Sequence, residues 1–84
     1  MRYVVEVLRS AEKQLERLPA GSQERILVAL EELAEVPRPE GCSKLTGREA
    51  WRIRVGDYRV IYEVHDDKQA VIVVVIRHRK DVYR

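Results

Sequence analysis

Three arginines are spaced so that a predicted hairpin would gather them on one face. Residues 51–55 and 58–64 alternate between apolar and polar side chains, as two neighbouring strands do, and only Gly56-Asp57 separates them. A two-residue Gly-Asp loop suits a type II′ turn, because glycine adopts the positive φ that its first central position requires. The turn fixes the pairing of the two strands, and it predicts that Arg54 lies directly opposite Arg59.

Alternation assigns the side chains of this hairpin to two faces. Arg52, Arg54 and Arg59 share one face, which could bind phosphate because each guanidinium offers a planar fork of donors. Like charges placed directly opposite each other are destabilising, and such a broken local rule often marks a functional site. Two simpler explanations for the three arginines remain open, namely that they pair with acids such as Glu63 or that they are simply exposed to water. The other face should pack on the core and carries Trp51, Ile53, Val55, Tyr58, Val60 and Tyr62.

Arginines beside groups that can carry protons suit the cleavage of RNA, whose 2′-hydroxyl is a built-in nucleophile. Arginines could stabilise the charge that develops on phosphorus, and a tyrosine, histidine or lysine could move protons. The basic tail 77–84 follows the last predicted strand and includes His78 as a candidate acid or base. The longer turn before that strand leaves its pairing open, so the sequence does not decide which of Arg77, His78 and Arg79 faces the arginines. No Asp or Glu cluster at metal-binding spacing accompanies them, which argues against a two-metal nuclease.

The helices and strands that must position these residues are predicted from the periodicity of apolar residues and from the residues that begin or end a helix. We expect a strand over 2–8, a helix from a Ser10 cap to Pro19, a second helix from a Ser22 cap to Pro37, a loop over 37–47, and a doubly buried strand over 70–76. The predicted fold is therefore α+β with the order β-α-α-β-β-β, an antiparallel sheet and both helices packed on one face.

Size and charge are consistent with a small RNA-binding protein. The 84 residues fit one domain, 1–84, and the longest apolar run is too short to span a bilayer. Residues 1–43 carry six Lys and Arg against eight Asp and Glu, whereas residues 44–84 carry ten against six. A basic C-terminal half favours an anionic partner. A start without a signal-peptide core and a single cysteine, Cys42, lead us to expect a cytoplasmic protein without disulfides.

Three segments together resemble the RelE/ParE superfamily of toxins, and specifically its RelE branch. They are residues 44–47 (Lys-Leu-Thr-Gly), residues 51–64 around the hairpin, and residues 78–83 (His-Arg-Lys-Asp-Val-Tyr). The resemblance covers essentially the whole chain. It implies the toxin of a type II toxin–antitoxin system, a ribosome-dependent endoribonuclease that cleaves mRNA by 2′-hydroxyl attack without metal or other cofactor and so inhibits translation.

The resemblance also implies residue roles. Arg52 and Arg54 occupy places where lysines that hold or activate the nucleotide are common, and arginine is a poor proton carrier. Arg59 matches the arginine that stabilises the transition state, Arg79 the arginine after the last strand, and Tyr83 the C-terminal tyrosine that stacks on or assists the nucleotide. The spacing from Arg79 to Tyr83 is short. The implied RNA contacts are Lys44, His78, Lys80 and Arg84.

Partners and competing functions follow from the same resemblance. A cognate RelB-like antitoxin would wrap a helix and an extended segment over the toxin in a hetero-oligomer, and the ribosome and mRNA would be the other partners. The first rival is a ParE-like toxin, which shares the fold but inhibits DNA gyrase by binding. The others are a non-catalytic RNA- or ribosome-binding protein and a module that only docks an antitoxin.

Overall fold

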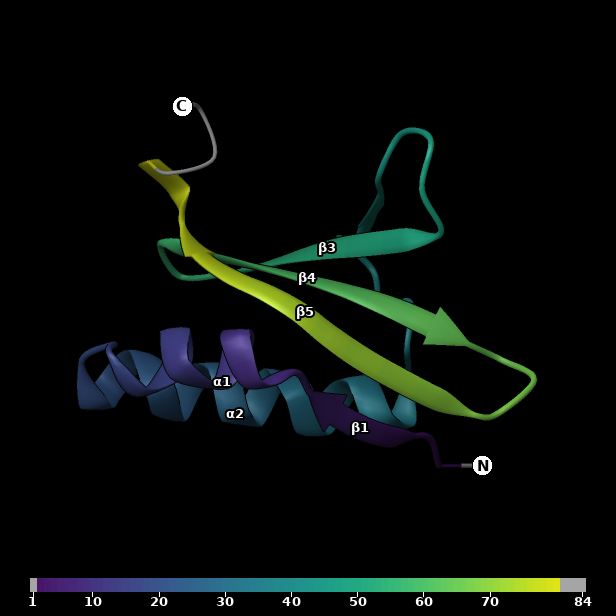
Figure 1. Cartoon of the computed structure of the whole chain (residues 1–84), viewed down its shortest axis with the longest axis horizontal. Helices are drawn as coiled ribbons and strands as arrows, with labels where there is room; N and C mark the ends of the chain where they lie inside the picture. Colours follow the sequence, from purple (N-terminus) through teal and green to yellow (C-terminus); the bar gives the residue numbers. More distant parts are fainter. Residues whose placement is uncertain (1, 81–84) are drawn as a thin grey trace.

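A five-stranded sheet carries both helices on one side (Figure 1). The computed structural model describes residues 2–80. The strands lie in the order β1-β5-β4-β3-β2, so β5, β4 and β3 are inner strands. The elements are β1 (Val4–Val7), α1 (Arg9–Glu16), α2 (Ala20–Glu35), β2 (Ser43–Lys44), β3 (Ala50–Val55), β4 (Tyr58–His65) and β5 (Ala70–His78).

The predicted α+β order is confirmed, with two differences in the sheet. The sheet is not wholly antiparallel, because β1 pairs in parallel with β5, from Val4 opposite Ala70 onward. The helical pair separates β1 from the β3–β4–β5 meander, and a crossover of this kind lets two strands run in the same direction. The predicted loop 37–47 also contains β2, which pairs with the first half of β3. A two-residue strand carries too little alternation to be recognised in a sequence.

Both helices begin earlier than the predicted serine caps. Helix α1 starts at Arg9, and α2 starts at Ala20 directly after Pro19. The Pro19 carbonyl accepts the N–H of Gln23 at 3.0 Å, and its φ of −55° already suits a helix. The Gln23 side chain donates to the Leu18 carbonyl at 2.8 Å and so satisfies an acceptor in the connection between the helices.

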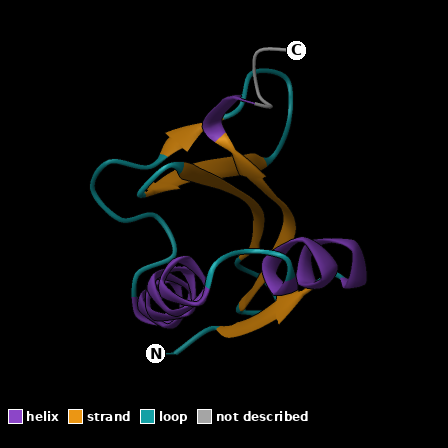
Figure 2. Ribbon diagram, turned by 90° about the vertical axis from the view of Figure 1, so that its left-hand side faces the viewer, coloured by secondary structure: helices purple, strands orange, loops and turns teal. Residues whose placement is uncertain are grey.

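Both helices lie on the same side of the curved sheet (Figure 2), and the hydrophobic core is formed by side chains of the helices and of the sheet face that they cover. The predicted assignment of the hairpin faces is confirmed, because Ile53, Val60 and Tyr62 are buried in this core. Trp51, Val55 and Tyr58 are only partly buried at its margin. The helices contribute Ala11, Leu15, Ile26, Leu30 and Leu33, and β5 contributes Val71, Val73 and Ile76.

An irregularity in the β4–β5 pairing changes which side chains of β5 face the core. Tyr62 pairs with Val73, but Ile61 pairs with Val75, so Val74 is an extra residue in β5. An extra residue reverses the alternation beyond it. Ile76 therefore packs into the core, and Arg77 faces the opposite side of the sheet.

A polar network ties the N-terminal strand to the far turn of the sheet. The Arg38 guanidinium donates to both carboxylate oxygens of Asp66, at 3.2 and 2.8 Å, and the Tyr3 hydroxyl donates to Asp66 at 2.6 Å. Hydrogen bonds from Arg38 and then Tyr3 lower the pKa of Asp66, and the bond to Asp66 raises the pKa of Tyr3. Arg38 also lies 5.1 Å from the centre of the Trp51 ring. In the described part of the chain, neither helix has the length and apolar character needed to cross a membrane.

Candidate functional site

A row of three arginines crosses the sheet on the face away from the helices. Arg54 on β3 pairs directly with Arg59 on β4, as the sequence predicts. Arg59 pairs in turn with Arg77 on β5. Directly paired residues share a face and lie close together, so we call Arg54, Arg59 and Arg77 the arginine row.

The arginine row has a nearly buried centre and two exposed ends. Arg59 lies in the middle and is 5% exposed, whereas Arg54 and Arg77 at the two ends are exposed. Neither Arg54 nor Arg77 forms an ion pair with another residue in the range 2–80. Glu63, the acid considered as an alternative partner, instead contacts His65 at 2.9 Å. A row of cations with exposed ends is therefore available to an anion.

A hollow of about 340 Å³ lies beside the row at the β3–β4 turn. Arg54, Arg59, Arg79 and Lys80 line it together with Asp57. The Arg79 backbone N–H donates to the Asp57 carbonyl at 2.7 Å, which anchors the start of the tail to the turn. The Arg79 Nε is also 3.8 Å from the Asp57 carboxylate, and both side chains are more than half exposed, so this ion pair is weak. Four predicted site residues thus line one concave surface.

Other predicted residues lie elsewhere. Arg52 shares the face of the row but stands two residue pairs away from it, opposite Ile61. Lys44 lies in the edge strand β2 and contacts Glu49 at 3.3 Å. His78 pairs with Tyr58 and packs edge-on against its ring, with ring centres 5.3 Å apart, on the face opposite the row. Tyr83 and Arg84 lie outside the described residues.

Two arginines near the row were not assigned from the sequence, which left Arg77 as one of three alternatives and did not single out Arg25. Arg77 belongs to it, and only the extra residue Val74 brings it there. Arg25 of α2 lies against the turn, with a guanidinium nitrogen 3.1 Å from the point where a Cβ would stand on Gly56. Gly56 has φ of +61°, so glycine serves the turn and also leaves room for Arg25. Nothing in the sequence signals this contact between a helix and a turn.

Comparison with known protein families shows to which family the chain belongs. A family model described as the ParE toxin of type II toxin–antitoxin system parDE matches residues 5–83. The chain belongs to the RelE/ParE family of type II toxins. A relative of this toxin is Toxin RelG of Mycobacterium tuberculosis, which is 33% identical over 90 residues that span all of this chain and 99% of RelG.

Solved structures of RelE proteins have the same fold. RelE in the archaeal RelE–RelB complex of Pyrococcus horikoshii superposes with a TM-score of 0.85 at 30% identity, covering 94% of this toxin and 97% of that chain. A mutant of Escherichia coli RelE in the free state gives 0.81 at 30% identity, covering 99% and 92%. Almost the whole chain is therefore a RelE-like fold.

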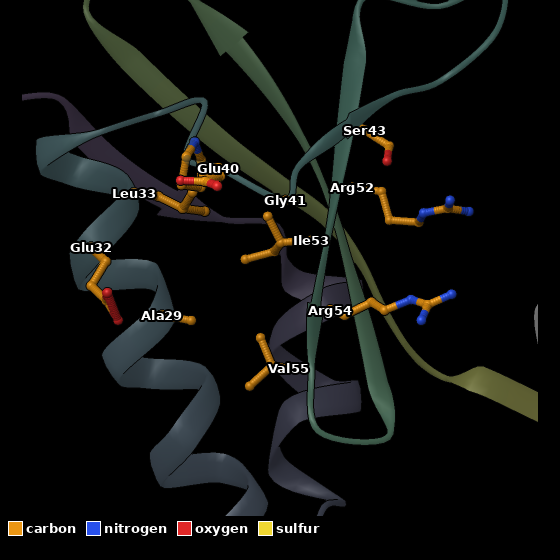
Figure 3. Close-up of a pocket in the computed structure, with 11 residues that line it drawn as sticks. Ala29, Glu32, Leu33, Glu40, Gly41, Ser43, Arg52, Ile53, Arg54 and Val55 are labelled. Carbon is orange, nitrogen blue, oxygen red and sulfur yellow. The ribbon is translucent and has the colours of Figure 1, made fainter.

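The toxin has a second, larger concavity on the opposite side of β3. It measures about 540 Å³ and lies between α2 and β3, where Leu33, Ile53 and Val55 form an apolar floor. Ile53 and Val55 point toward α2, whereas Arg52 and Arg54 point to the other side of the strand (Figure 3). The concavity is of mixed character, because Glu32, Glu40 and both of these arginines also line it.

Proposed function

We propose that this toxin is an endoribonuclease that cleaves messenger RNA on the ribosome by attack of the RNA 2′-hydroxyl, without a metal. The observation that carries the proposal is the arginine row, in which Arg59 is nearly buried between two other guanidinium groups. Like charges on directly paired strands repel each other, and a phosphate bound across the row would reduce that repulsion. Similarity to RelG and RelE proteins over almost the whole chain is consistent with this role.

In the proposed reaction the 2′-oxygen bonds to the adjacent phosphorus while the bond from phosphorus to the 5′-oxygen breaks. The 2′-hydroxyl loses a proton and the 5′-oxygen gains one, which leaves a 2′,3′-cyclic phosphate and a 5′-hydroxyl. Negative charge builds up on the phosphoryl oxygens in the transition state. Arg54, Arg59 and Arg77 would hold those oxygens with donors that are already in place before the reaction starts.

The two proton transfers need groups other than the arginines, because a guanidinium stays protonated at any physiological pH. Lys80 lines the hollow at the end of the row and is one candidate. Tyr83 follows three residues later and is the other, although it lies outside the described residues. The ribosome would hold the mRNA so that its 2′-hydroxyl is in line with the leaving oxygen, which supplies the orientation part of catalysis. This action would take place in the cytoplasm.

Primer extension on a defined mRNA, with and without translating ribosomes, tests the proposal. We expect cuts only when ribosomes are present. Arg59→Ala should lower the cleavage rate by about 10²–10³, as is usual when one donor to a transition-state oxyanion is lost. Because Arg59 is nearly buried, the exposed Arg77→Gln variant is the second test, and Arg9→Gln in α1 is the matched control. Equal cleavage by the parent and both row variants would remove the arginine row from the mechanism.

A RelB-like antitoxin is the second partner that we propose. The Pyrococcus horikoshii relative was solved in complex with RelB. In this toxin, Leu27 and Val28 of α2 are about half exposed, and Val28 lines a hollow next to the concavity between α2 and β3. Exposed apolar side chains of this size are typical of a surface that a partner covers. Val28→Glu should weaken antitoxin binding in calorimetry and leave RNA cleavage unchanged.

Inhibition of DNA gyrase is the alternative, because the matching family model is described as a ParE toxin. A folded protein that cuts no RNA with or without ribosomes, but blocks supercoiling by purified gyrase, would establish that alternative.

A further inference from the structure

Two apolar side chains next to the arginine row lie on the sheet face that the helices leave uncovered. Ile61 of β4 stands between Val60 and Tyr62, which are both buried in the core, so alternation directs Ile61 to the opposite face. Val75 of β5 pairs directly with Ile61. Both side chains are half-buried, and neither is part of the core. We call Ile61 and Val75 the apolar pair.

The uncovered face changes from cationic to acidic across the apolar pair. Arg52 stands opposite Ile61 and points away from α2 (Figure 3). The arginine row lies two residues from the apolar pair along each strand, a distance of about 6.7 Å. On the other side of the pair, two residues further along β4, Glu63 stands opposite Ile72, which pairs with Glu6 of β1. Cations, apolar side chains and carboxylates therefore follow one another within about 13 Å.

This order of charges fits a single nucleotide better than a continuing RNA backbone. A phosphate on the arginine row leaves its base within reach of the apolar pair, because one sugar separates the two. A second phosphate beyond the pair would be repelled by Glu63 and Glu6. A base is uncharged and has apolar faces, and proteins hold unstacked bases against aromatic or apolar side chains. A protein partner would instead need a wider apolar surface than two side chains between charged rows.

We propose that the apolar pair is a base-binding platform, which holds the base of the nucleotide whose phosphate lies on the arginine row. A base that removes about 40 Å² of apolar surface from water should tighten binding about fivefold. The inference deepens the proposed cleavage function and rests on its phosphate site, but the platform can be tested without cleavage.

The first test compares AMP, ribose 5-phosphate and adenosine by NMR of the methyl groups of the isolated toxin. The ring current of an adenine on the platform should shift the Ile61 and Val75 methyl resonances upfield with AMP but not with ribose 5-phosphate. AMP should bind about fivefold tighter than ribose 5-phosphate. The methyl groups of Ile53, which lies in the core on the other face of the sheet, should not shift.

Substitutions show whether the apolar pair causes this preference. Ile61→Thr and Val75→Thr remove apolar surface but keep β-branching, so the strands should still form, and each variant should lose most of the preference for AMP. Val4→Thr is the matched control, because Val4 is an exposed valine on the same face at the far edge of the sheet. Arg77→Gln should weaken the binding of AMP and ribose 5-phosphate alike.

The three probes separate failure of the platform from failure of the phosphate site. Equal binding of AMP and ribose 5-phosphate, without an upfield shift of the Ile61 methyl groups, would refute the platform and leave the phosphate site intact. If neither phosphate compound binds but adenosine still shifts these methyl groups, the platform stands and the phosphate site of the proposed function fails. No shift with any probe would refute both. If Ile61→Thr keeps the preference for AMP but weakens antitoxin binding, the pair belongs to a protein interface and the proposal is wrong.

The second test takes the platform to the proposed cleavage reaction on the ribosome. An mRNA in which one nucleotide beside the cut lacks its base but keeps its 2′-hydroxyl should be cut about fivefold more slowly by the parent. Ile61→Thr should cut this mRNA and the normal mRNA at similar rates, because it no longer gains from the base. An equal loss in the parent and in Ile61→Thr would overturn the platform and assign the hold on the base to the ribosome.

Discussion

Replacing Arg77 by glutamine should stabilise the toxin while it impairs cleavage. Arg77 and Arg59 are paired across neighbouring strands, so their charges lie about 6 Å apart. At an effective dielectric constant of about 40–80, two like charges at that distance repel by about 0.7–1.4 kcal/mol. Screening at physiological ionic strength reduces this to roughly 0.5 kcal/mol. For a chain of this size we expect the Tm to rise by about 2–4 °C.

Thermal melts at two ionic strengths are the assay. The parent should gain stability when salt rises from about 10 mM to 500 mM, because salt screens the row, and Arg77→Gln should gain less. Arg77→Lys keeps the charge and should melt like the parent. Arg48→Gln removes an exposed charge from the β2–β3 loop, away from the row, and is the control. If Arg77→Gln melts lower than the parent with the same salt dependence, the arginine row is compensated within the folded chain, and the reasoning from repulsion to phosphate binding fails.

Three further substitutions test the fold that holds the row. Trp51→Ala should destabilise the toxin by about 2–3 kcal/mol in urea unfolding, less than for a fully buried tryptophan, because the ring is only partly buried although it also contacts Arg38. Gly56→Ala should cost about 1–2 kcal/mol, because φ is +61° and the new methyl carbon would stand 3.1 Å from an Arg25 guanidinium nitrogen, which must shift slightly; a melt identical to the parent's would contradict this. Asp66 has a pKa below its unfolded value. Its contribution to the stability of the folded chain is therefore present above about pH 4 and is lost as pH falls through the lowered pKa. Asp66→Asn should therefore flatten the decline in stability between about pH 4 and pH 2, and an unchanged acid limb would show that the Arg38–Asp66 contact contributes nothing.

The hairpin could be predicted from the sequence because its determinants are local. Gly56-Asp57 allows one tight turn, and strict alternation on both sides leaves one pairing that buries Ile53, Val60 and Tyr62 together. A shift of one residue would have buried Arg54 and Arg59 and exposed the apolar set. Both the opposition of these two arginines and the orientation of the core face follow from that local constraint.

The third arginine could not be predicted because its determinants are distant in sequence. The run 70–76 is apolar on both faces, so its alternation does not distinguish a regular strand from one with an extra residue at Val74. The acceptor of the Ile76 N–H in the observed register is Gln14, 62 residues away in a helix. The parallel pairing of β1 with β5 is likewise a contact between chain ends, which periodicity does not report.

The two ends of the β4 strand have opposite electrostatic character, and this contrast explains how the fold supports the row. Beyond the end of β4, Asp66 is bound by Arg38 and Tyr3, which connect the turn to the loop after α2 and to the N-terminal strand. Near its start, Arg59 is held between Arg54 and Arg77. Side chains that repel one another stay in place only if the backbone beneath them is fixed by other contacts. The buried core and the Asp66 network provide those contacts at some distance from the row, so the cationic face can stay assembled before any phosphate binds.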